Sequence, residues 1–382
     1  MARGPFSGYK LARDPSVSRP IPVTIERQPT QEDPAASAKS ADGQLSAPPP
    51  VFSIAEAAGI ARTHFGLVGE VSRLTSERDA NFRIRQGGVS HVLKIANPAE
   101  APSVTNLQTM ALLHIERVDP GMKVQRVLPS LGGRHEEILG DGQGRPMVLR
   151  LFTYLEGEPL HLAPRSAAQR RSIGANLARL GLALRGFAHE AADHEIIWDI
   201  KHALKLRRYL PYIEEAEKRA LVERVLAGFE QNVQPLLADL RRQFVHNDLN
   251  PHNVLVEKGN PDAVVGILDF GDMVMTPLIN DLAIAASYQL AQAGNPLSEA
   301  GDLIAAYHQV SPLELREIDL LYDLIGARMA TTAAITSWRV ARYPENRDYI
   351  LRNAPRAWAG LKAFADLPRA EAQDYLRRLC GV

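Results

Sequence analysis

The chain has 382 residues, and its 44 Lys plus Arg balance its 44 Asp plus Glu. This neutrality disfavours a nucleic-acid-binding surface, and one cysteine, Cys380, excludes an internal disulfide or a cysteine-based metal site. No apolar run approaches the roughly 18–20 residues of a membrane-spanning helix, and no signal-peptide pattern follows Met1. We therefore expect a cytoplasmic monomer or homodimer with no nucleic-acid or membrane partner.

An N-terminal extension precedes the folded part of the chain. Residues 1–50 are rich in Pro, Ser, Ala and Gln, show no hydrophobic periodicity and end in Pro48-Pro49-Pro50. This composition predicts a disordered segment, because little apolar surface is available to offset the entropy cost of ordering. A basic docking or targeting arm is the alternative, since four cationic residues occur early: Arg3, Lys10, Arg13 and Arg19.

Residues 51–153 have the pattern of a small sheet accompanied by helices. Ser53-x-x-Glu56 is a capping box that opens a helix, and Val104, Leu107 and Ile115 recur at helical spacing. Strand-like runs cover residues 67–74, 80–85, 89–96, 124–128, 136–139 and 147–152. We expect a five-stranded antiparallel sheet with a helix.

From Ala168 onward the chain is mostly helical. An apolar stripe at helical spacing includes Ile173, Leu177, Leu180 and Leu184. Further helical stretches cover residues 221–240 and 320–340, and the segment 358–379 closes this half of the chain. The chain therefore divides into a sheet-containing half and a helical half.

One segment of the helical half, residues 244–272, carries the densest set of polar residues. It contains His246-x-Asp248-x-x-x-x-Asn253, then two apolar runs at hairpin spacing, and then Asp269-Phe270-Gly271. This order is the stated pattern of a phosphoryl-transfer loop followed by a metal-binding aspartate. An ordinary β-hairpin with incidental acids is the alternative, but it does not explain why all these residues occur together.

The chemistry of phosphoryl transfer accounts for the residue types in this segment. The protein mainly positions the reactants and compensates charge. Asp248 is placed to accept or orient the proton of an attacking hydroxyl. The amide oxygen of Asn253 and the carboxylate of Asp269 are hard ligands of the kind that Mg²⁺ prefers. His246 is expected to support the loop rather than to act as the base.

These motifs carry a family resemblance. The segments HNDLNPHNVLV, GILDFGDM and NDLAIA resemble the aminoglycoside phosphotransferase and homoserine kinase type II superfamily, and the closest branch is hydroxylysine kinase-like. The resemblance covers about residues 52–380. Protein kinases usually carry Arg where this chain has Asn247, and no Ala-Pro-Glu segment follows Gly271. Both features favour a small-molecule kinase over a protein kinase.

The resemblance implies a fold and a reaction. The fold is α+β and bilobal, protein-kinase-like, with an N-lobe over residues 51–153 and a helical C-lobe over 154–382. The reaction is Mg²⁺-dependent transfer of the γ-phosphate of ATP or GTP to a hydroxyl of a small molecule. An amino alcohol or a hydroxylated amino acid is the expected acceptor, and an aminoglycoside or homoserine-type acceptor is the alternative.

The resemblance also implies where the nucleotide binds. In the loop before residue 82, Ser76, Arg78 and Asn81 are expected to contact phosphates, and Lys94 is expected to hold the α- and β-phosphates. Tyr154 and Leu155 form the hinge whose backbone takes the base. Backbone recognition carries no side-chain code for adenine against guanine, so ATP and GTP both fit.

One residue departs from the family pattern. A kinase-like lobe usually pairs its lysine with an acid on the following helix, but Asn106 stands at that position. Asn106 or Gln108 is expected to hold Lys94 by a neutral hydrogen bond instead. The missing acid leaves a nucleotide-binding pseudoenzyme, acting as a sensor or partner, as an alternative to a kinase.

The acceptor site is less defined by sequence. Trp198, Asp199 and Asp272 are candidates, with Asp272 also placed to touch a second metal or an ammonium group. Asp281 is expected to cap a helix. Two arginines are expected to be structural or surface groups, with binding of a substrate carboxylate as the alternative: Arg328 and Arg339.

Overall fold

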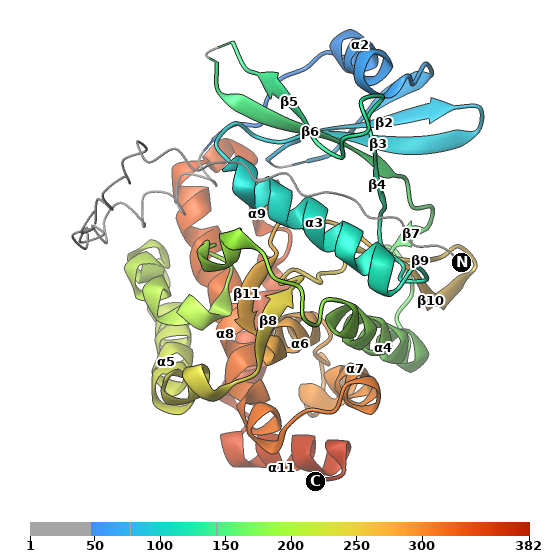
Figure 1. The fold of residues 1–382 in the computed structure, drawn as a ribbon. Helices are drawn as coiled ribbons and strands as arrows, with labels where there is room; N and C mark the ends of the chain where they lie inside the picture. Colours follow the sequence, from blue (N-terminus) through green and yellow to red (C-terminus); the bar gives the residue numbers. More distant parts are fainter. Residues whose placement is uncertain (1–46, 77, 143) are drawn as a thin grey trace, which may run out of the picture. The chain divides into compact units, whose positions relative to one another are not determined.

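The structure is a computed structural model, and it describes residues 47–382 apart from 77 and 143 (Figure 1). Most of the predicted disordered extension therefore lies outside the described residues, as does Glu77 of the expected phosphate loop. The described residues belong to one compact unit. None of their helices is long and apolar enough to cross a membrane.

The N-lobe is built on a six-stranded antiparallel sheet, rather than the five strands expected. Its strand order is β1-β2-β3-β6-β4, and β5 also pairs with β6. The elements are α2 (Ile54–Phe65), β1 (Glu70–Leu74), β2 (Ala80–Gln86), β3 (Val89–Ile95), α3 (Pro102–Val118), β4 (Val127–Leu128), β5 (Glu137–Gly140) and β6 (Pro146–Thr153).

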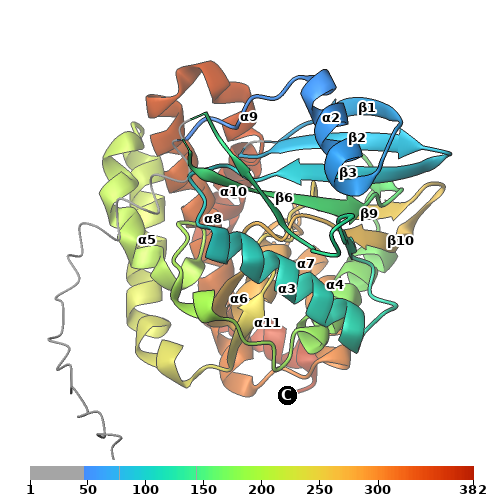
Figure 2. The same cartoon turned by 45° about the horizontal axis from the view of Figure 1, so that its top comes forward.

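The two faces of this sheet are covered by different helices (Figures 1 and 2). Helix α2 begins with the predicted capping box at Ser53, and its Ala61 and Phe65 pack in one cluster with Leu93 of β3. The alternation of side chains along a strand sends Val92 to the opposite face, where it joins the cluster that includes α3. Lys94 lies two residues further on and shares the face of Val92.

The C-lobe contains short strands and a bundle of helices (Figure 1). Its strands are β7 (Glu158–Pro159), β8 (Arg242–Val245), β9 (Val254–Glu257), β10 (Asn260–Ile267) and β11 (Val274–Pro277). Its α-helices are α4 (Ala167–Ala183), α5 (Ala216–Asn232), α6 (Leu278–Ser287), α7 (Leu297–Val310), α8 (Leu315–Arg342), α9 (Arg347–Leu351), α10 (Ala354–Ala365) and α11 (Arg369–Cys380). The 3-10 helices are η1 (Glu190–Asp193), η2 (Ile200–Tyr212), η3 (Gln234–Asp239) and η4 (Pro344–Asn346).

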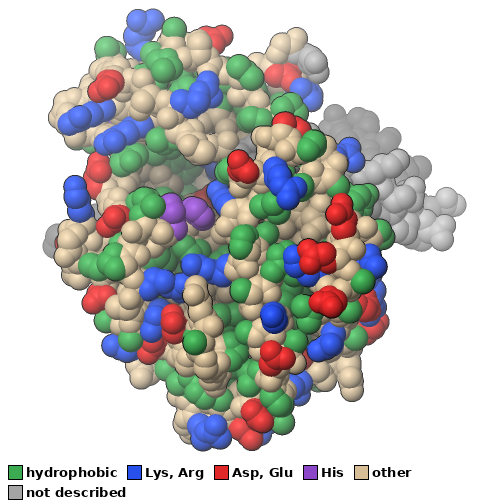
Figure 3. All heavy atoms as spheres, turned by 180° about the vertical axis from the view of Figure 1, so that it is seen from behind, with side chains coloured by type: hydrophobic (Ala, Val, Ile, Leu, Met, Phe, Trp, Pro, Cys, Tyr) green, Lys and Arg blue, Asp and Glu red, His purple; other side chains and the backbone are tan. Residues whose placement is uncertain are grey.

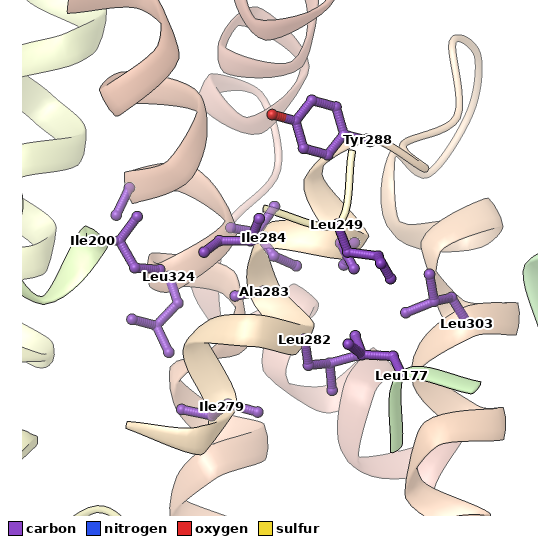
Figure 4. Packing of buried hydrophobic residues seen from close by; sticks show 14 of the residues in the cluster. Leu177, Ile200, Leu249, Ile279, Leu282, Ala283, Ile284, Tyr288, Leu303 and Leu324 are labelled. Carbon is purple, nitrogen blue, oxygen red and sulfur yellow. The ribbon is translucent and has the colours of Figure 1, made fainter. Parts of the chain in front are cut away.

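Helix α6 runs through the centre of the C-lobe core and is buried along its whole length. Figure 4 shows Leu282 of α6 close to Leu177 of α4, with Leu303 of α7 nearby, all members of one buried cluster. Leu249 of the segment between β8 and β9 belongs to the same cluster. The loop that carries Asp248 is therefore anchored in the apolar core.

Two expectations about helices are wrong. The single helix expected over 221–240 is divided, because α5 ends at Asn232 and Pro235 opens the separate 3-10 helix η3. Asp281 is not a helix cap, since it lies inside α6 and Pro277 stands at the N-cap. The reason is tertiary: the Asp281 carboxylate accepts hydrogen bonds from the backbone N–H groups of His246 and Asn247.

Candidate active site

A cavity of about 740 Å³ is lined by residues of both lobes. Its lining includes N-lobe strands β2, β3 and β6, the segment between β8 and β9, and one face of α8. Figure 3 shows the surface hollowed between the upper and lower parts of the molecule, with histidine and basic side chains at the edge. His161 and His252 both line the cavity, and their rings are in tilted contact with centroids 4.1 Å apart.

The loop between β8 and β9 is held in shape by hydrogen bonds between the His246 side chain and backbone groups. The His246 ring donates from Nε2 to the carbonyl of Leu268 (2.9 Å) and accepts at Nδ1 from the N–H of Asp248 (3.2 Å). His246 is fully buried, and its ring packs edge-on against Phe270. It therefore occupies the supporting position that the sequence predicted.

The backbone of this loop includes a sharp turn at Asn247, whose φ is 64°. Left-handed conformations cost a non-glycine residue energy and persist only where the surroundings enforce them. Here the Asp281 carboxylate accepts the N–H of Asn247 at 2.8 Å. Asp281 thus stabilises the conformation that turns Asp248 toward the cavity.

Three side chains fix the carboxylate of Asp248. Its Oδ1 accepts from Arg328 Nη2 at 2.9 Å, and its Oδ2 accepts from Asn250 Nδ2 at 2.8 Å and Asn253 Nδ2 at 2.9 Å. Burial raises the pKa of Asp248 to about 6; the charge of Arg328 opposes that rise and the charge of Asp272 adds to it. A carboxylate with this pKa is ionised near neutral pH and is a stronger base than an exposed aspartate.

Arg328 was expected to be a structural or surface group, and the structure places it in the buried interior. Its side chain is 3% exposed, it also donates to the hydroxyl of Tyr288 (3.0 Å), and its guanidinium lies over the Trp198 ring. The sequence gives no direct signal for this pairing, because α8 begins more than sixty residues after Asp248.

The residues expected to hold a metal fit a hard cation. The side-chain amide of Asn253 donates both of its hydrogens to Asp248, one to the backbone carbonyl oxygen (3.0 Å) and one to Oδ2. The amide oxygen of Asn253 is therefore the group available to a ligand. The N–H of Leu268 donates to the carbonyl of Asn253 (2.8 Å), so the residue before Asp269 is tied to the same loop.

The carboxylate of Asp269 completes this pair of candidate ligands. Asp269 has a φ of 60° and accepts the N–H of Gly271 on Oδ1 (3.1 Å). Burial acts to raise the pKa of Asp269, but the charges of Lys94 and Arg78 outweigh it, so the pKa lies below its usual value. Among the described residues no group of three or more His, Cys, Asp or Glu side chains is arranged for a metal. Phosphate and water oxygens would therefore have to complete the shell of an ion held here.

Lys94 is paired with an acid, but not with the one sought on the helix. Its Nζ lies 2.9 Å from Asp79 Oδ2. Asn106 instead donates to Glu136 and contacts His189 (3.0 Å), and Gln108 accepts from Arg150. The expectation that Asn106 or Gln108 holds Lys94 is therefore wrong.

Burial opposes the charge on Lys94, but the Asp79 carboxylate outweighs it, so the pKa of Lys94 lies above its usual value. Asp79 is itself positioned by the backbone, since its Oδ1 accepts the N–H of Asn97 (3.0 Å). Sequence reasoning missed Asp79, although it sits in the loop expected to bind phosphates. The pairing removes the one argument for a pseudoenzyme, which was the missing acid.

The loop before β2 also reaches the C-lobe. Arg78 donates to Asp272 Oδ1 at 2.8 Å, and both residues line the cavity. Ser76 accepts the N–H of Asp79 on its hydroxyl (3.2 Å), and Asn81 lies opposite Lys94 in the β2–β3 register. The structure thus brings Ser76, Arg78 and Asn81 to the same cavity as Asp248.

A buried arginine that sequence reasoning did not single out lies beside Lys94 on the neighbouring strand. Arg150 pairs with Lys94 in the β3–β6 register, is 1% exposed and donates to Gln108 Oε1 (3.0 Å) and to the carbonyl of Thr105 (3.2 Å). A signal exists in the sequence, since a charged residue interrupts the apolar run of β6. Arg150 links the sheet to α3 and adds positive charge to the nucleotide side of the cavity.

The remaining candidates are divided by their exposure to the cavity. Tyr154, Leu155, Trp198 and Asp272 line it. Asp199 does not: it is 1% exposed and accepts from the Thr276 hydroxyl (2.9 Å) and the Lys201 N–H (3.0 Å). Asp199 is thus engaged in the structure around η2 and is not among the residues that line the cavity.

The fold and the cavity define a class of protein. A bilobal, protein-kinase-like α+β fold, with the loop and hairpin around Asp248 facing the sheet, is that of the small-molecule phosphotransferases. The sequence pattern of the Phosphotransferase enzyme family matches residues 70–321, more than half of the chain. The chain belongs to this family, and it is a small-molecule kinase.

Relatives of known activity agree with this assignment. The hydroxylysine kinase of Mus musculus is 27% identical over 349 residues, 85% of this chain and 92% of the mouse protein. The hydroxylysine kinase of Bos taurus is 28% identical over 361 residues, 88% of this chain and 96% of the bovine protein.

Solved structures agree on the fold. A microcompartment-associated aminopropanol kinase superposes with a TM-score of 0.64 at 19% identity, over 86% of this chain and 98% of that one. The amicoumacin kinase hAmiN, in complex with AMP-PNP, Ca²⁺ and Ami, gives a TM-score of 0.61 at 17% identity, over 85% and 94% of the two chains. The predicted protein-kinase-like fold and family are confirmed.

Proposed function

We propose that the protein transfers the γ-phosphate of ATP or GTP to the side-chain hydroxyl of a hydroxylated amino acid, with 5-hydroxylysine as the first candidate. The observation that carries this proposal is the constellation around one cavity: Asp248 held by three donors, Asn253 and Asp269 beside it, and Lys94 facing them from the sheet. The similarity to two hydroxylysine kinases over most of their lengths supports the choice of acceptor.

The nucleotide is expected to lie under the sheet. Lys94 supplies a cation for the α- and β-phosphates, and Ser76, Arg78 and Asn81 lie around the same space. Arg78 is paired with Asp272 in this structure, so an incoming phosphate would compete with that carboxylate for the guanidinium. The backbone at Tyr154 and Leu155 would take the base.

A divalent cation, with Mg²⁺ as the expected ion, would be held by the amide oxygen of Asn253 and the carboxylate of Asp269. It would neutralise phosphate charge and align the γ-phosphate. A related amicoumacin kinase was solved with AMP-PNP and Ca²⁺, which supports the use of a nucleotide with a divalent ion.

The transfer step places the proton on Asp248. The acceptor oxygen forms a bond to the γ-phosphorus while the bond between that phosphorus and the β–γ bridging oxygen breaks. The hydroxyl proton passes to Asp248, and the nucleoside diphosphate leaves with the bridging oxygen. Arg328 remains paired with Asp248 and holds the carboxylate in its orientation.

An acceptor screen tests the proposal. Purified full-length protein with Mg²⁺ and ATP or GTP is assayed for acceptor-dependent diphosphate release with 5-hydroxylysine, homoserine, ethanolamine, choline and aminoglycosides. We expect turnover with 5-hydroxylysine that Asp248→Ala abolishes. Turnover with an aminoglycoside or with homoserine alone would replace the proposed acceptor. No turnover, with nucleotide still bound, would refute the proposed reaction for this panel.

A further inference from the structure

Tyr288 presents a phenolic hydroxyl to the cavity near Asp248. The residue stands at the C-terminal end of α6, lines the cavity and is 6% exposed. Its backbone is held on both sides, because its N–H donates to the carbonyl of Ala285 (3.3 Å) and its carbonyl accepts from Arg165 Nη2 (3.1 Å). Figure 4 shows its hydroxyl pointing away from Leu303 of the buried cluster. Tyr288 is therefore anchored in the core of the C-lobe by its ring and backbone, while its polar atom is directed out of that core.

One nitrogen of Arg328 joins the Tyr288 hydroxyl to the carboxylate of Asp248. Nη2 of Arg328 donates to the Tyr288 oxygen at 3.0 Å and to Asp248 Oδ1 at 2.9 Å. The two N–H bonds of this nitrogen diverge by about 120°, so the two oxygens lie roughly 5 Å apart. A ligand oxygen can therefore lie at hydrogen-bond distance from both of them at once.

Oδ1 is the oxygen of Asp248 that has room for a ligand. Oδ2 already accepts from Asn250 Nδ2 (2.8 Å) and Asn253 Nδ2 (2.9 Å), and a carboxylate oxygen offers about two lone-pair sites. Within the part of the chain that the structure describes, Oδ1 accepts from Arg328 only, so one of its sites is open. The proton of an acceptor hydroxyl would therefore be taken at Oδ1, the oxygen that shares Arg328 with Tyr288.

The hydroxyl of Tyr288 still has a hydrogen to donate. Its oxygen accepts from Arg328, and among the described residues no group accepts the phenolic hydrogen. Burial raises the pKa of Tyr288 and the charge of Asp248 adds to that rise, while the charge of Arg328 opposes it, so the phenol stays protonated at neutral pH. An unused donor on the wall of a cavity indicates that the occupant of the cavity supplies the hydrogen-bond acceptor.

We infer that the Tyr288 hydroxyl donates to the oxygen of the acceptor's hydroxyl while that hydroxyl donates its own hydrogen to Asp248 Oδ1. This inference rests on the proposed function and adds a second contact that orients the nucleophile. A hydroxyl oxygen carries one hydrogen and two lone pairs. With the hydrogen on Asp248 and one lone pair on Tyr288, the remaining lone pair is left to attack the γ-phosphorus.

The test compares two ligands that differ by one hydroxyl group. Dissociation constants of 5-hydroxylysine and of free lysine are measured by calorimetry for the full-length wild type and Tyr288→Phe, each with Mg²⁺ and a non-hydrolysable nucleotide. We expect Tyr288→Phe to weaken the binding of 5-hydroxylysine by about threefold to tenfold and to change the Kd of lysine by less than about twofold. The kcat with 5-hydroxylysine should also fall, because one contact orients the nucleophile instead of two.

Tyr322→Phe is the matched control. The Tyr322 hydroxyl donates to the carbonyls of Phe364 (2.9 Å) and Leu367 (3.0 Å), and the residue does not line the cavity. Removal of this hydroxyl should therefore leave both dissociation constants unchanged.

The possible failures of the inference and of the proposed function are distinct. Equal weakening of both ligands in Tyr288→Phe would mean that the hydroxyl only supports the cavity wall, and it would overturn the inference. Unchanged dissociation constants would overturn it as well, and a fall in kcat alone would then show that Tyr288 acts on Asp248 through Arg328. A wild type that does not phosphorylate 5-hydroxylysine would refute the proposed acceptor itself.

Discussion

At the scale of single residues, Asp248 is the group that we propose accepts the proton. Its carboxylate is fixed by Arg328, Asn250 and Asn253, so replacing an oxygen by an amide removes the base without removing the space that it fills. We expect Asp248→Asn to lower kcat by about 10²–10⁴-fold. Nucleotide affinity, measured by calorimetry, should stay within about twofold of wild type. A variant with wild-type kcat would contradict the assignment.

The pKa of Asp248 gives a pH dependence with a definite sign. Burial raises this pKa to about 6, and only the ionised carboxylate can accept the proton. We therefore expect kcat/KM to fall about tenfold per pH unit below pH ~6. The nearby charge of Asp272 contributes to the raised pKa, so Asp272→Asn should move this acid limb to lower pH. A profile that is flat down to pH ~5 would exclude Asp248 as the base.

Residue spacing predicted part of this site. Asp248, Asn253 and Asp269 were identified because a loop and a hairpin bring them together within one short segment. The partner of Asp248 on α8 and the backbone contacts of Asp281 depend on how helices pack far along the chain. Local sequence patterns carry no information on such contacts, so the sequence could not name the partner of Arg328, and it assigned Asp281 to a helix cap.

At the scale of elements, the acid that pairs with Lys94 comes from the loop before β2 and not from helix α3, where a kinase-like lobe usually carries it. Asp79 holds Lys94, while Asn106 of α3 faces Glu136 and His189. The pattern of strands and helices was recoverable from hydrophobic periodicity. The ion pair was not, because it joins the end of a turn to the neighbouring strand and carries no periodic signal.

Because Lys94 pairs with Asp79 and not with Asn106, substitutions at these two positions should affect nucleotide binding differently. Asp79→Asn removes the charge that holds Lys94, and we expect the KM for the nucleotide to rise about tenfold, because Lys94 loses its orientation toward the phosphates. Asn106→Ala should leave that KM unchanged. Steady-state kinetics with the nucleotide as the varied substrate checks both. A larger effect from Asn106→Ala would mean that α3 controls Lys94 after all.

At the scale of the whole molecule, the nucleotide would bridge residues from both lobes. Binding to the folded state alone stabilises a protein by about 2.7 kcal/mol at a ligand concentration of 100 times Kd. For a chain of this size we expect Mg²⁺ with a non-hydrolysable nucleotide to raise Tm by about 2–4 °C. Chelation of the ion, or Asp269→Asn, should remove most of this shift. A full shift in the presence of EDTA would show that the cation is not needed for binding.

Helix α8 connects Asp248 to the packing of the C-lobe. Arg328 pairs with the Asp248 carboxylate, and most residues of α8 are buried. The orientation of the carboxylate proposed as the base therefore depends on how α8 is packed. A substitution in the core around this helix, far from the cavity, would then act on the reaction as a change in the cavity itself would.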